Sequence, residues 1–332
     1  MDLTYRPLVA ADVRACLELL QGHLAYPADV LDDIARAWRR LLRDEALHGA
    51  VVEMMDARGA AVIVGFGASV FVTSDWAAHA RSGDKPYLSV RTLQQDLDGR
   101  PSVLRPLDIA RANDTTGLRV LILHYGESRG LPPEARPPLR YLVFEAFIHM
   151  LRGYRVNEVL QELWDELDPE FVVRGWGRVL ADYRAWFAGR GEPVPPPGQG
   201  PVLIGITREE CLADPGALAA PIFIDARARL SFTRAEQRLL AEALTGKADP
   251  ELSRALRLAL PTIKSRWRGI YDRVKQLAPE VLPADSEAGG AAGRGQEKRR
   301  HLLEYLRRHP EELCPALARN RHDPEPGAAV PL

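Results

Sequence analysis

The sequence contains few of the features that mark secreted, membrane or metal-binding proteins. Its three cysteines, Cys16, Cys211 and Cys314, lie far apart, which indicates neither a disulfide framework nor a zinc cluster. No apolar run approaches the roughly 20 residues of a membrane span, and the opening MDLTYRPLVAADV has no signal-peptide pattern. We therefore expect a cytoplasmic protein with no membrane contact, no metal and no cofactor.

Motifs for common enzyme chemistry are also missing, since the chain has no Walker loop, nucleophile motif or zinc-ligand spacing. His124 and Tyr125 close an expected strand, where a catalytic pair could lie, but a structural histidine is the favoured interpretation. One acidic stretch lacks partners for a metal site and is interpreted as a solvated helix face; it contains Glu162, Asp165, Glu166 and Asp168. We predict no catalytic residue.

The composition is typical of folded, soluble protein, but the charge is unevenly distributed. Hydrophobic residues make up 46% of the 332, which is enough for two domains that each bury a core. Residues 231–310 carry 16 Lys/Arg against 10 Asp/Glu, whereas the remainder carries 28 against 35. A basic C-terminal module on an acidic domain suits a DNA anchor joined to a sensing domain.

Residues 232–274 are interpreted as three short helices with separate start signals. Thr233 and Glu236 have the spacing of a capping box, and Pro250 and Pro261 stand in the first turns of the next two helices. At about 100° per residue, one side of the third helix is apolar. That side collects Ile263, Trp267, Ile270 and Val274.

This segment resembles the helix-turn-helix of LuxR-type transcriptional regulators over about 45 residues. The matching positions are Phe232-Thr233, Glu236, Leu239-Leu240, Thr262-Ile263-Lys264 and Ile270-Tyr271. Two positions depart from the family: Arg257 replaces a glycine in the turn, and Ala259 replaces a serine that caps the third helix. Loss of that cap costs about 1 kcal/mol.

The resemblance implies an all-α helix-turn-helix domain that binds double-stranded DNA. A homodimer is expected because one such helix reads few base pairs. The DNA-binding residues are expected on the third helix and its flanks: Thr262, Lys264, Ser265, Arg266, Arg268 and Arg273.

The N-terminal part is predicted to be α+β. The hydrophobic periodicity predicts a strand at 4–8, helices at 10–20 and 28–43, a hairpin at 50–72, a strand at 118–124, helices at 139–152 and 157–167, and a strand at 171–173. Gly65-Phe66-Gly67 indicates a bulge or a close backbone approach. This order resembles the GNAT acetyltransferase fold, which implies a mixed sheet covered by helices.

The loop after His124 departs from the GNAT pattern. The family has Arg/Gln-x-x-Gly-x-Gly/Ala there, and its amides bind the pyrophosphate of acetyl-CoA. This chain instead reads GESRGLPPEARPPLR, and its prolines have no N–H to donate; they are Pro132, Pro133, Pro137 and Pro138. We therefore expect a domain that senses a small-molecule effector or a protein partner in place of acetyl-CoA.

Composition shifts divide the chain into seven segments. Residues 202–229 contain two strand-like runs, which either complete the N-terminal sheet or form a bridge. The predicted segments are a GNAT-like sensory domain (1–187), a Pro/Gly linker (188–201), a strand-containing bridge (202–229), the DNA-binding domain (230–282), a flexible linker (283–296), a basic amphipathic helix (297–319) and a disordered tail (320–332).

Three functions compete. The leading hypothesis is a DNA-binding transcriptional regulator whose N-terminal domain senses a ligand or partner. The alternative is an acyl-CoA-dependent N-acetyltransferase fused to a DNA-binding anchor. The third is a module whose three C-terminal helices bind protein.

Overall fold

The computed structural model describes residues 2–24, 26–56, 59–164, 176–196, 200–214, 216–283 and 291–314. The chain divides into two compact units, Met1–Ala226 (unit 1) and Arg227–Leu332 (unit 2), and each is described by itself. The predicted strand at 171–173 and the tail at 320–332 lie outside the described residues.

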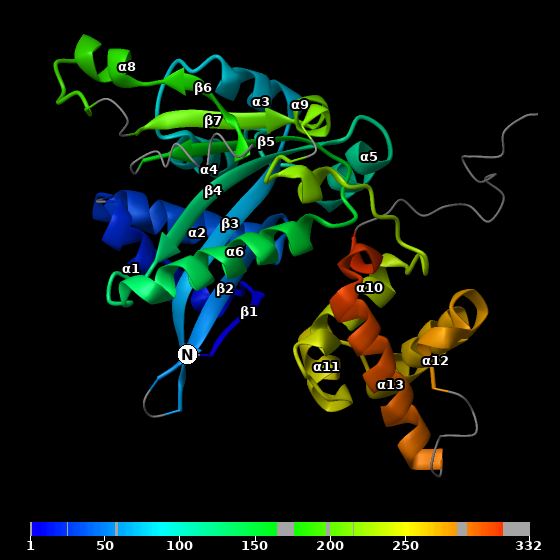
Figure 1. Cartoon of the computed structure of the whole chain (residues 1–332). Helices are drawn as coiled ribbons and strands as arrows, with labels where there is room; N and C mark the ends of the chain where they lie inside the picture. The colour runs from blue at the N-terminus through cyan, green and yellow to red at the C-terminus, as the bar shows by residue number, and fades with distance from the viewer. Residues whose placement is uncertain are drawn as a thin grey trace, which may run out of the picture. The chain divides into compact units, whose positions relative to one another are not determined.

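Unit 1 is built on one seven-stranded mixed sheet with the order β1-β2-β3-β4-β5-β7-β6 (Figure 1). The neighbouring pairs from β1 to β4 are antiparallel, β4 and β5 are parallel, and β7 is antiparallel to both β5 and β6. The strands are β1 (Leu3–Pro7), β2 (Leu47–Met55), β3 (Ala61–Val72), β4 (Leu118–Glu127), β5 (Val156–Leu163), β6 (Arg178–Asp182) and β7 (Val202–Thr207).

Helices cover both faces of this sheet. The described helices of unit 1 are α1 (Val13–His23), α2 (Ala28–Arg43), α3 (Ser74–Arg81), α4 (Leu88–Leu97), α5 (Pro106–Asp114), α6 (Arg136–Leu151), α8 (Arg184–Gly189) and α9 (Arg208–Ala213). Adjacent residues of β2 show the two faces, because Val51 joins the core under α1, α2 and α4, whereas Val52 packs with Leu139 of α6. Figure 1 shows α2 and α6 on opposite sides of β2 and β3.

Two glycines of β3 allow α6 to approach the sheet closely. A Cβ at Gly65 would lie 2.9 Å from Leu139 Cδ1, and one at Gly67 would lie 3.1 Å from Val143 Cγ1. The register between β2 and β3 also shifts beside Gly65, between Val52 and Glu53. The bulge and the close approach predicted for Gly65-Phe66-Gly67 are therefore both present.

One prediction for unit 1 is wrong, because residues 157–163 of the helix predicted at 157–167 belong to strand β5. Of the two alternatives left open for residues 202–229, the structure shows the first, since 202–207 form strand β7 of the same sheet. In β5, buried Glu158 is paired with Arg81 of α3, whose Nε lies 2.5 Å from Glu158 Oε1. Arg81, from a distant segment of the chain, thus neutralises a charge that otherwise argues against a buried strand.

The described residues of unit 2 form helices and 3-10 turns. The helices are α10 (Arg234–Leu244), α11 (Asp249–Leu256), α12 (Leu260–Leu277) and α13 (Ala291–Arg308). The capping box is present, because Glu236 N donates to Thr233 Oγ1 (3.3 Å) and Thr233 N donates to Glu236 Oε2 (2.8 Å). Residues 291–296, predicted as linker, belong to α13.

The core of unit 2 contains the predicted apolar side of α12 together with one side of α13. Ile263, Trp267, Ile270 and Val274 are all buried, as are Leu302, Leu303 and Leu306. Arg257, which occupies the position of the family's glycine, adopts left-handed backbone angles (φ 52°, ψ 46°). Ala259 caps α12 without a side-chain hydrogen bond, as its chemistry requires.

At the level of topology, unit 1 resembles the GNAT-like mixed sheet with helices that the sequence predicted. Among the described residues, no helix is long and apolar enough to cross a membrane.

Candidate active site

Strand β4 pairs with β5 over only half of its own length. Their parallel pairing runs from Leu118 and Val156 to Ile122 and Gln161. Where it ends, β4 contains a bulge, because Ala68 pairs with His124 and Ser69 pairs with Ile122. This bulge increases the local bend of β4. It therefore contributes to the opening between the two strands.

Ser89 of α4 holds the bulge in place. Leu123, the extra residue of the bulge, has a carbonyl that accepts a hydrogen bond from Ser89 Oγ (2.5 Å). Ser89 and Leu123 are both buried. Without this bond, the Leu123 carbonyl would give up its hydrogen bonds to water on folding and gain none in return. Helix α4 is thereby tied to the point where β4 leaves β5.

A cavity of about 100 Å³ lies at this opening, and we call it the β4/β5 pocket. Its lining mixes apolar side chains with polar groups from α4, β4 and β5. The lining residues are Leu20, Leu24, Tyr26, Ser89, Ile122, Leu123, His124, Tyr125, Gln161, Glu162, Leu163 and Trp164.

His124 is buried in the wall of this pocket. Its ring lies 5.6 Å from the ring of Trp38 and 6.1 Å from that of Tyr26, and neither ring nitrogen has a hydrogen-bond partner among the described residues. Burial lowers the pKa of His124 to about 3. The imidazole is therefore neutral near pH 7, which rules it out as a group that titrates there.

Glu162 is the pocket's one group that titrates near neutral pH. Burial raises its pKa to about 7, although hydrogen bonds to Oε2 from Trp164 Nε1 (3.0 Å) and Leu88 N (3.0 Å) oppose the shift. The other oxygen, Oε1, is buried and has no hydrogen-bond partner among the described residues. The sequence interpretation of Glu162 as part of a solvated helix face is wrong, because β5 turns it inward; Asp165, Glu166 and Asp168 lie outside the described residues.

The two tyrosines of the pocket differ in their hydrogen bonding. Tyr125 donates from its hydroxyl to Glu127 (2.6 Å), which Arg140 also binds at 2.8 and 3.0 Å. Burial and then this bond raise the pKa of Tyr125. Burial also raises the pKa of Tyr26, so that its phenol keeps its proton across the physiological range.

The loop after β4 does not form an amide cradle for a pyrophosphate. The amides of Leu131, Ala135 and Arg136 are already donated, to the carbonyls of Ser128, Pro132 and Pro133. Helix α6 opens on Arg136-Pro137-Pro138, so two of its first amides are missing. The residues present therefore do not fit the pyrophosphate of coenzyme A.

The predicted DNA-binding residues all lie on α12, in unit 2. Thr262, Lys264, Ser265 and Arg268 are exposed on the side away from the core. Arg266 and Arg273 are half-buried, and Arg273 lies 3.5 Å from Glu236 in an ion pair. The first four thus form one continuous surface, whereas Arg273 is engaged with α10.

No group of three or more potential metal ligands occurs among the described residues. The sequence interpretation missed two features of unit 1. The first is the role of Tyr26, Ser89 and Glu162 in one pocket, for which the sequence has no local signal. The second is a stripe of arginines on α2, whose helical spacing was readable from the sequence.

No family model and no curated protein matches the chain. Among solved structures, it is similar to the C-terminal condensation domain of Ebony, in complex with beta-alanyl-dopamine (12% identity, TM-score 0.32, 62% of this chain and 99% of that chain). It is also similar to FeeM, an N-acyl amino acid synthase (10% identity, TM-score 0.32, 63% of this chain and 94% of that chain). A third similar structure is the GphF GNAT-like decarboxylase in complex with isobutyryl-CoA (17% identity, TM-score 0.32, 61% of this chain and 98% of that chain).

These matches correct the leading functional prediction. The proteins named above are a condensation domain, an N-acyl amino acid synthase and a GNAT-like decarboxylase, and none of them is a LuxR-like transcriptional regulator.

Proposed function

We propose that unit 1 is an N-acyltransferase-type domain that transfers an acyl group from a thioester to an amine in the β4/β5 pocket. The observation that carries this proposal is Glu162, a carboxyl group whose pKa of about 7 suits a general base at neutral pH. Its Oε2 is held by Trp164 and Leu88, which leaves Oε1 to accept a proton.

The proposed reaction needs only groups that the pocket supplies. Glu162 removes a proton from the substrate amine, the nitrogen attacks the acyl carbon, and the carbon–sulfur bond breaks. Tyr26 lines the pocket with a protonated phenol; we propose that it protonates the departing sulfur and that the proton taken up by Glu162 then returns to the Tyr26 phenolate. His124 is neutral and has no part in this proton transfer.

The donor is proposed to be recognised by its acyl thioester and not by a nucleotide. The loop of Ser128 to Arg136 uses its amides internally, so it offers a pyrophosphate little binding energy. We expect acetyl-CoA to bind no more tightly than about millimolar in calorimetry. We also expect kcat/KM for acetyl-CoA to lie within about tenfold of that for acetyl-N-acetylcysteamine, a thioester without a nucleotide.

Thiol release from both thioesters, in the presence of a panel of primary amines, tests the proposal. The rate should rise with pH through about 7, and Glu162→Gln should lower kcat by about 100-fold or more. Glu209→Gln, which changes an exposed carboxylate of α9, is the matched control and should leave kcat unchanged. Equal rates for wild type and Glu162→Gln would remove Glu162 from the mechanism.

We further propose that unit 2 is a helix-turn-helix module that anchors this acyltransferase on double-stranded DNA as a homodimer. Lys264 and Arg268 support this proposal, because they are exposed, positively charged and one helical turn apart on α12. Thr262 and Ser265 lie on the same exposed surface, where they can reach bases or phosphates.

Gel shifts with DNA recovered from cells by the intact protein test the anchor. Lys264→Ala with Arg268→Ala should weaken binding by about 2–5 kcal/mol and reduce its salt dependence, while the melting temperature changes by less than about 3 °C. Arg254→Ala with Arg307→Ala removes two exposed charges elsewhere on unit 2 and serves as the control. Unchanged affinity of the Lys264/Arg268 variant would exclude α12 as the DNA-binding helix.

A further inference from the structure

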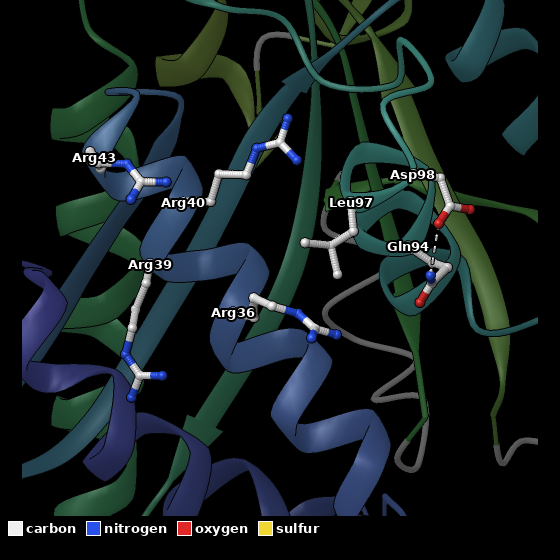
Figure 2. Close-up of a pocket in the computed structure, with 7 residues that line it drawn as sticks. All are labelled: Arg36, Arg39, Arg40, Arg43, Gln94, Leu97 and Asp98. Carbon is white, nitrogen blue, oxygen red and sulfur yellow. Dashed lines mark hydrogen bonds between the residues drawn. The ribbon is translucent and has the colours of Figure 1, made fainter.

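A second cavity, separate from the β4/β5 pocket, lies between α2 and α4. It has a volume of about 640 Å³, and we call it the arginine cleft (Figure 2). Helix α2 lines it with Arg36, Arg39, Arg40 and Arg43, and helix α4 lines it with Gln94, Leu97 and Asp98. The lining therefore holds four guanidinium groups and one carboxylate, and the carboxylates of Asp33, Asp44 and Asp96 lie beside it.

The four arginines form a continuous stripe for a geometric reason. Their spacing of three, four and seven residues places them on one side of α2, within about 10 Å along its axis. The opposite side is buried and holds Ile34, Trp38 and Leu41. The packing of α2 therefore needs only its apolar side, and the stripe is not explained by the core of unit 1.

The surrounding carboxylates leave part of this charge uncompensated. Arg36 pairs with Asp33. Arg40 Nη1 donates to the carbonyl of Asp96 (3.2 Å), and its Nε lies 3.9 Å from the carboxylates of both Asp44 and Asp96. Arg39, by contrast, is exposed and has no ion pair or hydrogen bond among the described residues.

The remaining charges of the cleft are only weakly neutralised. The nearest carboxylate oxygen to Arg43, from Asp44, lies 3.8 Å from its Nε. Asp98, the carboxylate of the lining, is itself bound by Arg100 (2.7 Å) and Gln94 Nε2 (3.1 Å). Arg39 and Arg43 are thus available to an anion that enters the cleft.

We propose that the arginine cleft binds the linked phosphate groups of a small molecule. Several guanidinium groups within about 10 Å match a ligand that carries several negative charges over a short length, and guanidinium binds phosphate oxygens in pairs. A cavity of this volume is in the range of small-molecule sites. An acidic protein face would bring its charges on a broader surface, which a concave site between two helices suits less well.

Calorimetry with inorganic triphosphate on the full chain, at about 50 mM salt, tests this proposal. Triphosphate should bind, and Arg39→Ala with Arg43→Ala should weaken binding by about 100-fold, since each lost charged hydrogen bond is worth about tenfold or more. Arg14→Ala with Arg111→Ala removes two exposed charges from other helices of unit 1 and should change affinity by less than about twofold.

Further ligands separate the alternatives. ATP that binds as tightly as triphosphate would mean that the phosphates supply the affinity, and tighter binding would mean that the nucleoside adds contacts; both agree with the proposal. Absence of triphosphate binding, equal affinity of the Arg39/Arg43 variant, or tighter binding of citrate or a polyglutamate peptide than of triphosphate would overturn it.

Discussion

The contacts inside unit 1 and those inside unit 2 differ in how far apart in the sequence the contacting residues lie. In unit 1, Glu158 of β5 pairs with Thr207 of β7, and Glu162 binds the backbone of Leu88. In unit 2, Thr233 N donates to Glu236 Oε2 (2.8 Å), three positions away, and Trp267 Nε1 donates to Asp249 (3.2 Å), 18 positions away. The helix starts of unit 2 can therefore be read from short segments, although its packing also uses distant partners such as Glu312, which accepts from Leu230 N (2.8 Å). The sheet and pocket of unit 1 depend throughout on residues that meet only after folding.

The largest expected effect tests whether the two units unfold separately. Trp38→Ala should lower the free energy of unfolding of unit 1 by about 3–5 kcal/mol, and Trp267→Ala should do the same for unit 2, since each removes a large buried side chain. Hydrogen exchange measured by mass spectrometry on the full chain reports each unit by its own peptides. Loss of protection in both units from either substitution would show that they unfold together.

The next effect concerns the pH dependence of unit 1. The pKa of Glu162 is about 7 in the folded state and 4.5 for an ordinary glutamate, so the folded state binds more protons between these values. The free energy of unfolding should therefore fall as pH rises through that window, by up to about 3 kcal/mol.

Glu162→Gln, which keeps an acceptor for Trp164 and Leu88, should remove this fall and make the protein more stable than wild type at pH 8. Urea denaturation at pH 5 and pH 8 measures both. A wild-type protein whose stability does not fall between these pH values would mean that Glu162 is not desolvated as the structure indicates.

A smaller effect is expected where unit 2 itself uses a long-range contact. Arg299 of α13 lies over the Trp267 ring (4.7 Å), donates to Asp249 (2.8 Å) and donates to the carbonyl of Lys247 (2.6 Å). Arg299→Ala should destabilise unit 2 by about 1–2 kcal/mol. Thermal melts should show almost no change for Arg300→Ala, whose guanidinium is exposed; equal effects of the two substitutions would contradict a specific role for Arg299.

The smallest effect is local and has the opposite sign. Arg257→Gly should stabilise unit 2 by about 0.5–1 kcal/mol, because glycine adopts a φ of 52° without the steric cost that a side chain imposes. Arg257→Ala keeps the Cβ and should give no such gain. Chemical denaturation of both variants makes the comparison, and destabilisation by glycine would mean that the arginine side chain contributes more than the backbone strain costs.

Predictions from the sequence were correct where a structure depends on residues close together in the chain, and wrong where it depends on residues far apart. The capping box of α10 and the buried side of α12 were predicted correctly, because a helix repeats its pattern within a few residues. The same reasoning assigned residues 157–167 to a helix, although 156–163 form β5. The leading functional prediction rested on unit 2, whose helices follow a local sequence pattern, and not on the larger unit 1.

The sequence by itself determined the helices of unit 2, the close approach at Gly65 and Gly67, and the loss of amide donors at Pro137 and Pro138. Each of these depends on the covalent structure of a residue and its near neighbours. Only the tertiary structure decided that Glu162 lies in a pocket with Tyr26, Ser89 and His124. Its pKa depends on which side chains exclude water from it, and those come from α1, α4, β4 and the segment before α2, which are distant in the sequence and adjacent only in the fold.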